Sequence, residues 1–207
     1  NKIPGFRVQQ ATAMGLSNTV VTFAFWMRSA DRVAGGRTGP ECLVDVRSHP
    51  SNKNGNTIGL EATGRIVCQP RTQTQTGATI TNTCTYLVND KAWHHIAVVQ
   101  DQRATGAMTF YIDGIFCGRT PTSFEWTFNP LTPITLGGLI DSTESGYWHH
   151  FNGDLDDFRI YPRELSEAEI GQVMRNETQP PGNQAVRVIA QDALALYYPF
   201  TNAPVNA

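Results

Sequence analysis

Residues Asp141 to His150 are the best candidate in this sequence for a ligand-binding loop. The run reads Asp-Ser-Thr-Glu-Ser-Gly-Tyr-Trp-His-His, which sets carboxylates, hydroxyls and imidazoles beside two adjacent aromatic rings. Sugars stack their C–H faces on such rings, and the polar side chains can hydrogen-bond their hydroxyl groups. The alternative is that the aromatic pair caps the end of a hydrophobic core. The predicted ligand-binding residues are Asp141, Glu144, Tyr147, Trp148, His149 and His150.

A second group of carboxylates lies in the run Asn152-Gly-Asp-Leu-Asp-Asp. Asp156 shares its parity with Phe158 and Ile160, so we expect its side chain to point towards the edge of the core. A carboxylate there needs hydrogen-bond donors or a cation, and calcium takes several oxygen ligands, including backbone carbonyls. Two interpretations stay open: Asp156 binds calcium, or it accepts backbone N–H groups. The sequence contains no EF-hand loop that would decide between them.

The cysteines Cys42, Cys68, Cys84 and Cys117 form an even set without C-x-x-C spacing, which gives no support to a zinc or thioredoxin-type site. We predict disulfides instead. Of the three possible pairings we favour Cys68 with Cys84, across the loop 71–83, which leaves Cys42 with Cys117. The alternative is four buried thiols. Asn176 begins an Asn-Glu-Thr glycosylation sequon, a further weak indication of secretion.

Charge and missing motifs exclude several classes of function. A formal net charge of −2, with 16% charged residues, gives little attraction for nucleic acid or an anionic membrane. No uninterrupted apolar run reaches the roughly 18 residues of a membrane span. The sequence has no Gly-x-Ser-x-Gly elbow, no phosphate-binding glycine loop and no Glu-x-Asp-x-x-Glu pattern of sandwich glycosidases. We therefore predict that the protein is not an enzyme, and that it binds neither nucleic acid nor membrane.

The elements that must position these side chains are β-strands. Two alternating apolar runs, Trp93–Gln100 and Met108–Gly114, predict a β-hairpin. Ile96 and Val98 fall on one face and apolar residues also cover the other, so the hairpin is expected to be central in its sheet. Asp113-Gly114 predicts a tight turn into a third strand, because this pair tolerates positive φ.

Further strands are predicted by runs of β-branched and aromatic residues between turn-forming residues. In Val20–Arg28, the strongest run, Thr22, Ala24 and Trp26 fall on one face. Aromatic alternation predicts that Phe124, Trp126 and Phe128 line the core. The remaining predicted strands are 6–8, 41–48, 57–61, 65–68, 79–88, 124–128, 134–138 and 154–161.

One short helix interrupts this pattern. Ser166-Glu-Ala-Glu169 is a capping box, and an apolar stripe follows it, which predicts a helix near residues 166–176. Residues 192–200 give a final strand signal that ends at proline. Strands every eight to twelve residues favour a β-sandwich or jelly roll, and the length suits a single domain.

The ordered set of these motifs resembles the laminin-G-like, concanavalin A-like jelly roll of the pentraxin and LamG-like superfamily. The resemblance covers about residues 20 to 175 and implies an all-β fold, a two-sheet antiparallel jelly-roll sandwich. The motifs that carry it are, in order, Phe23–Arg28, Trp93–Val99, Phe110–Gly114, Leu136–Gly138 and Phe151–Ser166.

The resemblance implies an extracellular or cell-surface module, part of a larger multidomain protein, that binds a glycan. A protein-interaction or adhesion module on the same fold is the alternative. Related jelly rolls often carry a structural calcium fed by a carboxylate near the position of Asp156. An aromatic strand that usually opens such domains closes this chain. We expect a single domain over 1–207, with residues 192–200 completing the sandwich in their own molecule or a neighbour, or else starting a following repeat.

Overall fold

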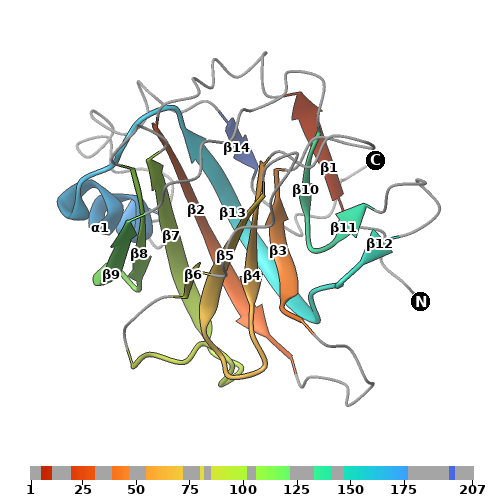
Figure 1. Ribbon diagram of the computed structural model, residues 1–207. Helices are drawn as coiled ribbons and strands as arrows, with labels where there is room; N and C mark the ends of the chain where they lie inside the picture. Colours follow the sequence, from red (N-terminus) through yellow and green to blue (C-terminus); the bar gives the residue numbers. More distant parts are fainter. Residues whose placement is uncertain are drawn as a thin grey trace, which may run out of the picture.

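The computed structural model describes residues 6–10, 20–30, 39–46, 55–71, 80–81, 85–101, 106–121, 133–140, 147–176 and 196–198. In this part of the chain, two six-stranded antiparallel sheets pack face to face and one helix lies outside them (Figure 1). The prediction of an all-β, two-sheet jelly-roll sandwich with one short helix is confirmed.

Sheet A, the nearer sheet in Figure 1, has the strand order β1-β10-β3-β4-β5-β6. Strand β10 comes from the second half of the sequence and lies between β1 and β3, which come from the first half. The bounds are β1 Phe6–Gln10, β3 Glu41–Asp45, β4 Gly55–Leu60, β5 Ile66–Arg71, β6 Ile80–Thr81 and β10 Pro133–Leu136.

Sheet B has the order β14-β13-β2-β7-β8-β9, so the predicted hairpin β7–β8 is central, as expected. Asp113 and Gly114 have φ of 52° and 77°, which confirms the tight turn between β8 and β9. A separate hairpin joins β11 Leu139–Ile140 to β12 Tyr147–Trp148. The bounds of sheet B are β2 Val20–Ser29, β7 Trp93–Asp101, β8 Ala107–Ile112, β9 Ile115–Pro121, β13 Gly153–Tyr161 and β14 Leu196–Tyr198.

The main core lies between the sheets, because each strand turns one apolar face inwards. Three rings meet at its centre: the Phe158 ring lies 6.4 Å from that of Phe23 and 6.3 Å from that of Phe25, centroid to centroid. The alternation predicted for the strands of sheet B is confirmed by the buried residues of this core, which include Val21, Phe23, Phe25, Met27, Ile96 and Val98. The predicted aromatic strand 124–128 lies outside the described residues.

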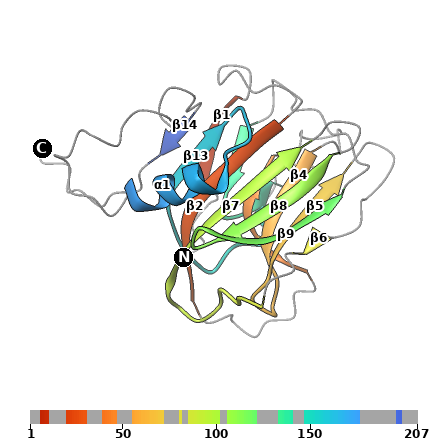
Figure 2. The same cartoon turned by 90° about the vertical axis from the view of Figure 1, so that its left-hand side faces the viewer.

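A smaller apolar cluster lies on the outer face of sheet B, the face turned away from sheet A, where α1 (Glu167–Asn176) packs (Figure 2). Ile170 and Val173 of the helix are buried there against Ala24 and Ala97. The capping box is confirmed: Ser166 N donates to Glu169 Oε2 at 2.8 Å, and Glu169 N donates to Ser166 Oγ at 3.3 Å. The helix therefore begins where the sequence predicts.

Replacing Ser166 with alanine is expected to lower the free energy of unfolding by about 1 kcal/mol, because a side-chain acceptor at the helix start is lost. The Arg163 guanidinium, 2.8 Å from Glu169, would hold that carboxylate in place. Urea denaturation followed by circular dichroism measures the loss. The control is Ser166→Thr, which keeps the hydroxyl; an equal loss in both variants would contradict a capping role.

Three sequence predictions differ from the structure. In the described part of the strand expected at 79–88, residues 80–81 form β6. Residues 85–92 form a loop in which Val88 N donates to Gly64 O and Val88 O accepts a hydrogen bond from Ser29 Oγ. The strand expected at 41–48 ends at Asp45. The prediction that the Asp156 side chain points towards the core is also wrong, for a reason that lies in strand β13.

Strand β13 contains a β-bulge at Asp157, whose φ is 48°. Leu155 lies opposite Met27 and packs on the inner core, whereas Asp156 lies opposite Trp26 on the outer face. The extra residue then returns Phe158 to the core. A single bulge thus reverses the face that simple alternation assigns to Asp156.

The C-terminal strand signal is present as β14, which pairs with β13 of the same chain. Tyr198 lies opposite Phe158, and Leu196 lies opposite Ile160. This pairing makes β14 an edge strand of sheet B.

Candidate functional site

The last two residues of the predicted ligand loop, His149 and His150, are hydrogen-bonded to sheet A. The His149 carbonyl oxygen accepts a hydrogen bond of 2.7 Å from Cys42 N, and His150 forms a parallel bridge with Cys42. His149 has a φ of 52°, and its imidazole packs on Gly39, where an added Cβ would meet Cε1 at 2.9 Å. Both histidines are half-buried beside β3.

The other predicted loop residues are placed only in part. Tyr147 and Trp148 form β12, opposite Ile140 and Leu139. Asp141 and Glu144 lie outside the described residues. Ligand binding by these residues stays a prediction.

Next to these histidines, a polar row crosses the outer face of sheet A. Thr135, Asp45, Thr57 and Gln69 lie directly opposite one another on four adjacent strands. Ile58, the neighbour of Thr57, packs in the inner core, so the polar row faces away from it. Cys42 lies opposite Gly59, two residues from Thr57, which places its partner His150 on this same face.

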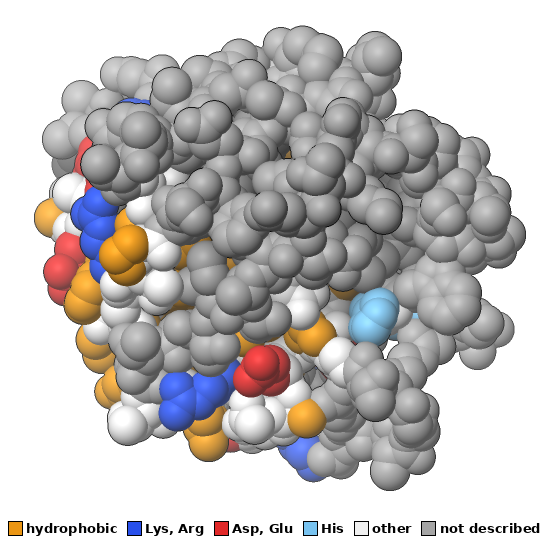
Figure 3. Space-filling view, viewed as in Figure 1, with side chains coloured by type: hydrophobic (Ala, Val, Ile, Leu, Met, Phe, Trp, Pro, Cys, Tyr) orange, Lys and Arg blue, Asp and Glu red, His pale blue; other side chains and the backbone are white. Residues whose placement is uncertain are grey.

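Asp45, Thr57 and Thr135 are buried although they lie on the outside of the sandwich. Buried polar groups need hydrogen-bond partners: Thr57 Oγ1 donates to Asp45 Oδ1 at 2.9 Å, and Thr135 Oγ1 donates to the Gly138 carbonyl at 3.0 Å. In Figure 3, drawn from this side, pale blue histidine atoms reach the surface. The hydroxyl and carboxylate groups of the polar row are thus held in fixed positions, next to the two half-buried histidines.

Asp156 is not part of this site, because it lies on the outer face of sheet B. Its Oδ1 accepts a hydrogen bond of 2.8 Å from Asp157 N, the kind of contact that one of the two interpretations expected. Among the described residues, no group of three or more His, Cys, Asp and Glu side chains could hold a metal ion. Calcium binding stays a prediction, as does glycosylation of Asn176, the last residue of α1.

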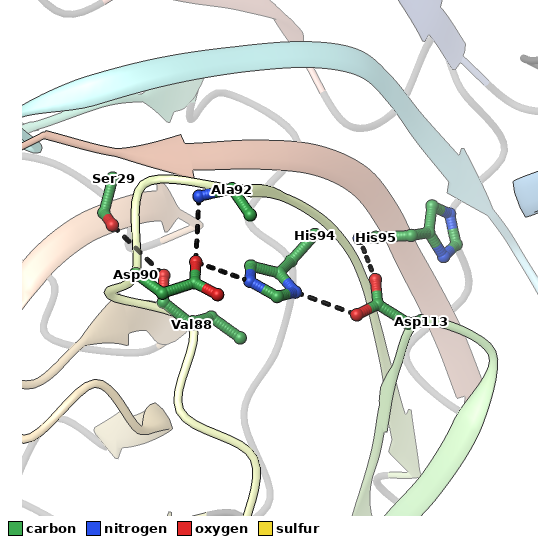
Figure 4. A network of polar contacts seen from close by, with 7 residues as sticks. All are labelled: Ser29, Val88, Asp90, Ala92, His94, His95 and Asp113. Atoms are coloured by element: carbon green, nitrogen blue, oxygen red, sulfur yellow. Dashed lines mark hydrogen bonds and ion pairs between the residues drawn. The ribbon is translucent and has the colours of Figure 1, made fainter.

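A second polar cluster holds His94 at the start of β7 (Figure 4). His94 Nδ1 lies 2.8 Å from Asp113 Oδ2, and His94 Nε2 lies 2.9 Å from Asp90 Oδ1. Burial works against the charged imidazole, but these two hydrogen bonds outweigh it and raise the pKa of His94. Asp113 Oδ1 also accepts His95 N at 2.8 Å. The cluster ties the loop before β7 to the turn after β8, a structural role.

His95 points to the opposite face and is fully buried. Burial, with the nearby charge of Arg159, lowers the pKa of His95 to about 3, so the imidazole is neutral at physiological pH. Its ring packs edge-on against Trp26, 5.4 Å between centroids. Neither histidine of the pair belongs to the site on sheet A.

The predicted disulfide pairings are wrong. Cys68 and Cys42 are buried thiols, so neither the pair Cys68–Cys84 nor the pair Cys42–Cys117 is formed. Burial raises the pKa of the Cys68 thiol to about 12. Cys117 is disulfide-bonded, and its partner lies outside the described residues. Loop length, on which the favoured pairing relied, does not indicate which cysteines the strands bring next to each other.

Comparison with known proteins assigns the family. The model of a laminin G family, described as the concanavalin A-like lectin/glucanases superfamily, matches residues 7–171. This chain belongs to that superfamily. No helix among the described residues is long and apolar enough to cross a membrane.

One curated relative is human neuronal pentraxin-2, which is 31% identical over 106 residues. The match covers 46% of this chain and only 23% of the pentraxin. Among solved structures, the SAP-like pentraxin of Limulus polyphemus has a TM-score of 0.61 at 14% identity, covering 84% of this chain and 78% of the other. The CBM40 module of the Ruminococcus gnavus IT-sialidase has a TM-score of 0.58 at 13% identity, covering 83% and 97%. At these identities the two structures show the fold alone.

The polar row on sheet A was not predicted from the sequence. Asp45, Thr57 and Thr135 are separate in sequence and each occupies an ordinary place in an alternating strand. The register across β10, β3 and β4 brings them together, and a single sequence does not contain that register. The sequence did contain one indication of the row: each of these strands has a polar residue at a position whose side chain points away from the core.

Proposed function

We propose that this chain is a non-catalytic, extracellular binding module that recognises glycans on the outer face of sheet A. The observation that carries the proposal is the polar row beside the two histidines. It combines hydroxyl acceptors, a carboxylate and an amide on one sheet face, which are groups that hydrogen-bond sugar hydroxyls. The sheet backbone fixes their positions before a ligand arrives, which reduces the entropy that binding costs.

The fold neighbours support a binding role. The CBM40 structure was determined with bound α2,6 sialyllactose, and a putative carbohydrate-binding protein from Bacteroides ovatus has the same fold. Within the proposal, residues Asp141, Glu144, Tyr147 and Trp148 add a second wall of polar and aromatic groups next to His149 and His150. Calcium held through Asp156, on the other side of the sandwich, would stabilise the fold instead of contacting the glycan.

The proposal treats residues 1–207 as one domain of a longer protein at the cell surface. A catalytic role is not proposed, because retaining and inverting glycosidases need two carboxylates about 5–10 Å apart across the scissile bond. The sequence lacks the alternating pattern that would present them on one strand face.

A protein-interaction module is the second candidate, and one observation favours it. Ile115 and Phe116, at the start of edge strand β9, are about half exposed, at 47% and 49%. Exposed large apolar side chains on a sheet edge are common in protein-binding surfaces.

A glycan array with sulphated, sialylated and neutral sugars, with and without calcium, tests the proposal. We expect specific binding that falls about tenfold in Thr57→Val and in His150→Ala, because each removes a polar group of the site. The matched control is Thr109→Val, the same change at a buried threonine on sheet B. Silence across the array, or equal loss in the control, would reject glycan recognition at this face and favour the protein-binding candidate.

A further inference from the structure

An exposed row of aromatic and charged side chains crosses the outer face of sheet B. Trp93 of β7 lies opposite Arg28 of β2, and Arg28 lies opposite Asp154 of β13. Arg28 is two residues from Trp26 and four from Ala24, which packs under α1, so the row shares the face that α1 covers. Trp93 is 40% exposed, and the side chains of Arg28 and Asp154 are 47% and 55% exposed. We call these three residues the Trp93 row.

The three side chains hold one another in a fixed arrangement. The Arg28 guanidinium carbon lies over the Trp93 ring, 5.1 Å from its centroid. Arg28 Nε and Nη2 both donate to Asp154 Oδ2, at 2.9 Å and 2.7 Å. A planar guanidinium that is stacked on one side and ion-paired on the other has little freedom left.

The surroundings of the Trp93 row are equally constrained (Figure 4). His94, the next residue after Trp93, is held by Asp90 and Asp113. Ser29, the next residue after Arg28, donates to Val88 O at 3.2 Å. The row is therefore preorganised from both strands, as binding sites with little ordering cost are.

The chemistry of the row fits a neutral sugar ring. Among the described residues, no hydrogen bond is accepted by Asp154 Oδ1 and none is donated by Arg28 Nη1. One acceptor and one donor therefore remain beside an exposed indole. A pyranose can stack its C–H face on the indole and hydrogen-bond neighbouring hydroxyls to these two groups. The charge of Arg28 is already matched by Asp154, which removes the preference for an anionic ligand.

The pair of residues behind the row supports a polar ligand on this face. Trp26 is two residues before Arg28 on β2, and His95 is two residues after Trp93 on β7, so both lie on the same face as the row. Within the part of the chain that the structure describes, Trp26 Nε1 and both ring nitrogens of His95 are buried without a hydrogen-bond partner. Such groups in native proteins are commonly met by ordered water, so this face holds polar atoms that still need partners next to the row.

We propose that the Trp93 row is a second saccharide subsite, specific for a neutral pyranose, on the side of the sandwich opposite the polar row. It goes beyond the function proposed above, because no residue of that site contributes to it.

The test titrates the intact chain with cellotriose, chitotriose and laminaritriose, followed by saturation-transfer difference NMR and tryptophan fluorescence. At least one trisaccharide is expected to bind, and Trp93→Ala should weaken it by about tenfold or more, as loss of a central aromatic anchor does. Asp154→Asn, a change at an exposed position that keeps the side-chain shape, should weaken it too and serves if Trp93→Ala does not fold.

Two control variants distinguish sugar binding at the Trp93 row from binding elsewhere on the protein. Phe116→Ala removes a similarly exposed aromatic ring from β9 and should leave trisaccharide affinity unchanged. Thr57→Val alters the site on sheet A and should leave unchanged the part of the binding that Trp93→Ala removes. The proposal is overturned if none of these sugars binds, which would make a protein the candidate occupant, or if binding responds to Thr57→Val and not to Trp93→Ala. Loss of array binding in Thr57→Val alone leaves this subsite intact, so the two proposals fail separately.

Discussion

Replacing Phe158 with alanine is expected to lower the free energy of unfolding by about 3–5 kcal/mol. Phe158 is fully buried, and its ring lies between those of Phe23 and Phe25 at the centre of the inner core. Truncation removes the transfer free energy of the ring and leaves a cavity that two packed sheets cannot easily close. Guanidinium denaturation followed by near-ultraviolet circular dichroism measures the loss.

The matched control is Phe116→Ala, because Phe116 is an aromatic residue on the same sheet with half of its surface exposed. It should cost much less, about 1 kcal/mol at most, since its ring packs edge-on against Tyr111 at the surface of the sheet. Phe158→Leu tests the same idea if the alanine variant does not fold, and a smaller loss of the same sign is expected. Equal losses at positions 158 and 116 would contradict the assignment of the core.

The second large effect is a loss of stability in acid that depends on His95. The ordinary pKa of histidine is about 6.5 in the unfolded chain, whereas the buried imidazole has a pKa of about 3. Between these values the unfolded chain binds more protons than the folded protein, so the free energy of unfolding falls as the pH falls. The slope approaches about 1.4 kcal/mol per pH unit, which gives roughly 3 kcal/mol between pH 7 and 4.5.

His95→Phe should remove most of this acid sensitivity, because phenylalanine can keep the edge-on contact with Trp26 and has no proton to bind. The measurement is the difference in free energy of unfolding between pH 7 and pH 4.5, wild type against variant, so that the titration of carboxylates cancels. If the variant lost as much stability in acid as the wild type, His95 would not be the group responsible.

His94 provides the opposite control. Its pKa is raised in the folded protein, so its charged form stabilises the fold fully below the ordinary pKa of about 6.5. That contribution is lost only as the pH rises through the higher folded value. His94→Gln should therefore lower stability at pH 6 and leave the acid slope between pH 6 and 4.5 nearly unchanged.

Local signals in the sequence were sufficient for most of sheet B. The alternation in Val20–Arg28 and Trp93–Gln100, the turn at Asp113-Gly114 and the capping box at Ser166 are each encoded within a few residues, and each is present in the structure. Local patterns of this kind depend on side-chain parity and turn chemistry, which one sequence contains.

The errors arose where distant strands decide the outcome. Asp156 changes face because of one bulge, and Cys42 on β3 and Cys68 on β5 are thiols because the pairing of strands does not join them to another cysteine. The polar row on sheet A depends on the pairing of β10 with β3, between residues about ninety positions apart in the chain, and no local pattern predicts that register.

The position of β14 also affects how this protein should be divided. The family match ends at residue 171, yet the strand that lies against Phe158 and Ile160 comes from residues 196–198. A fragment cut at the family boundary would expose the backbone N–H and C=O groups of β13 along that length. Open strand edges promote pairing with other chains and aggregation. Strand β14 therefore supplies backbone partners to β13, although it lies beyond the part of the chain by which the family is defined.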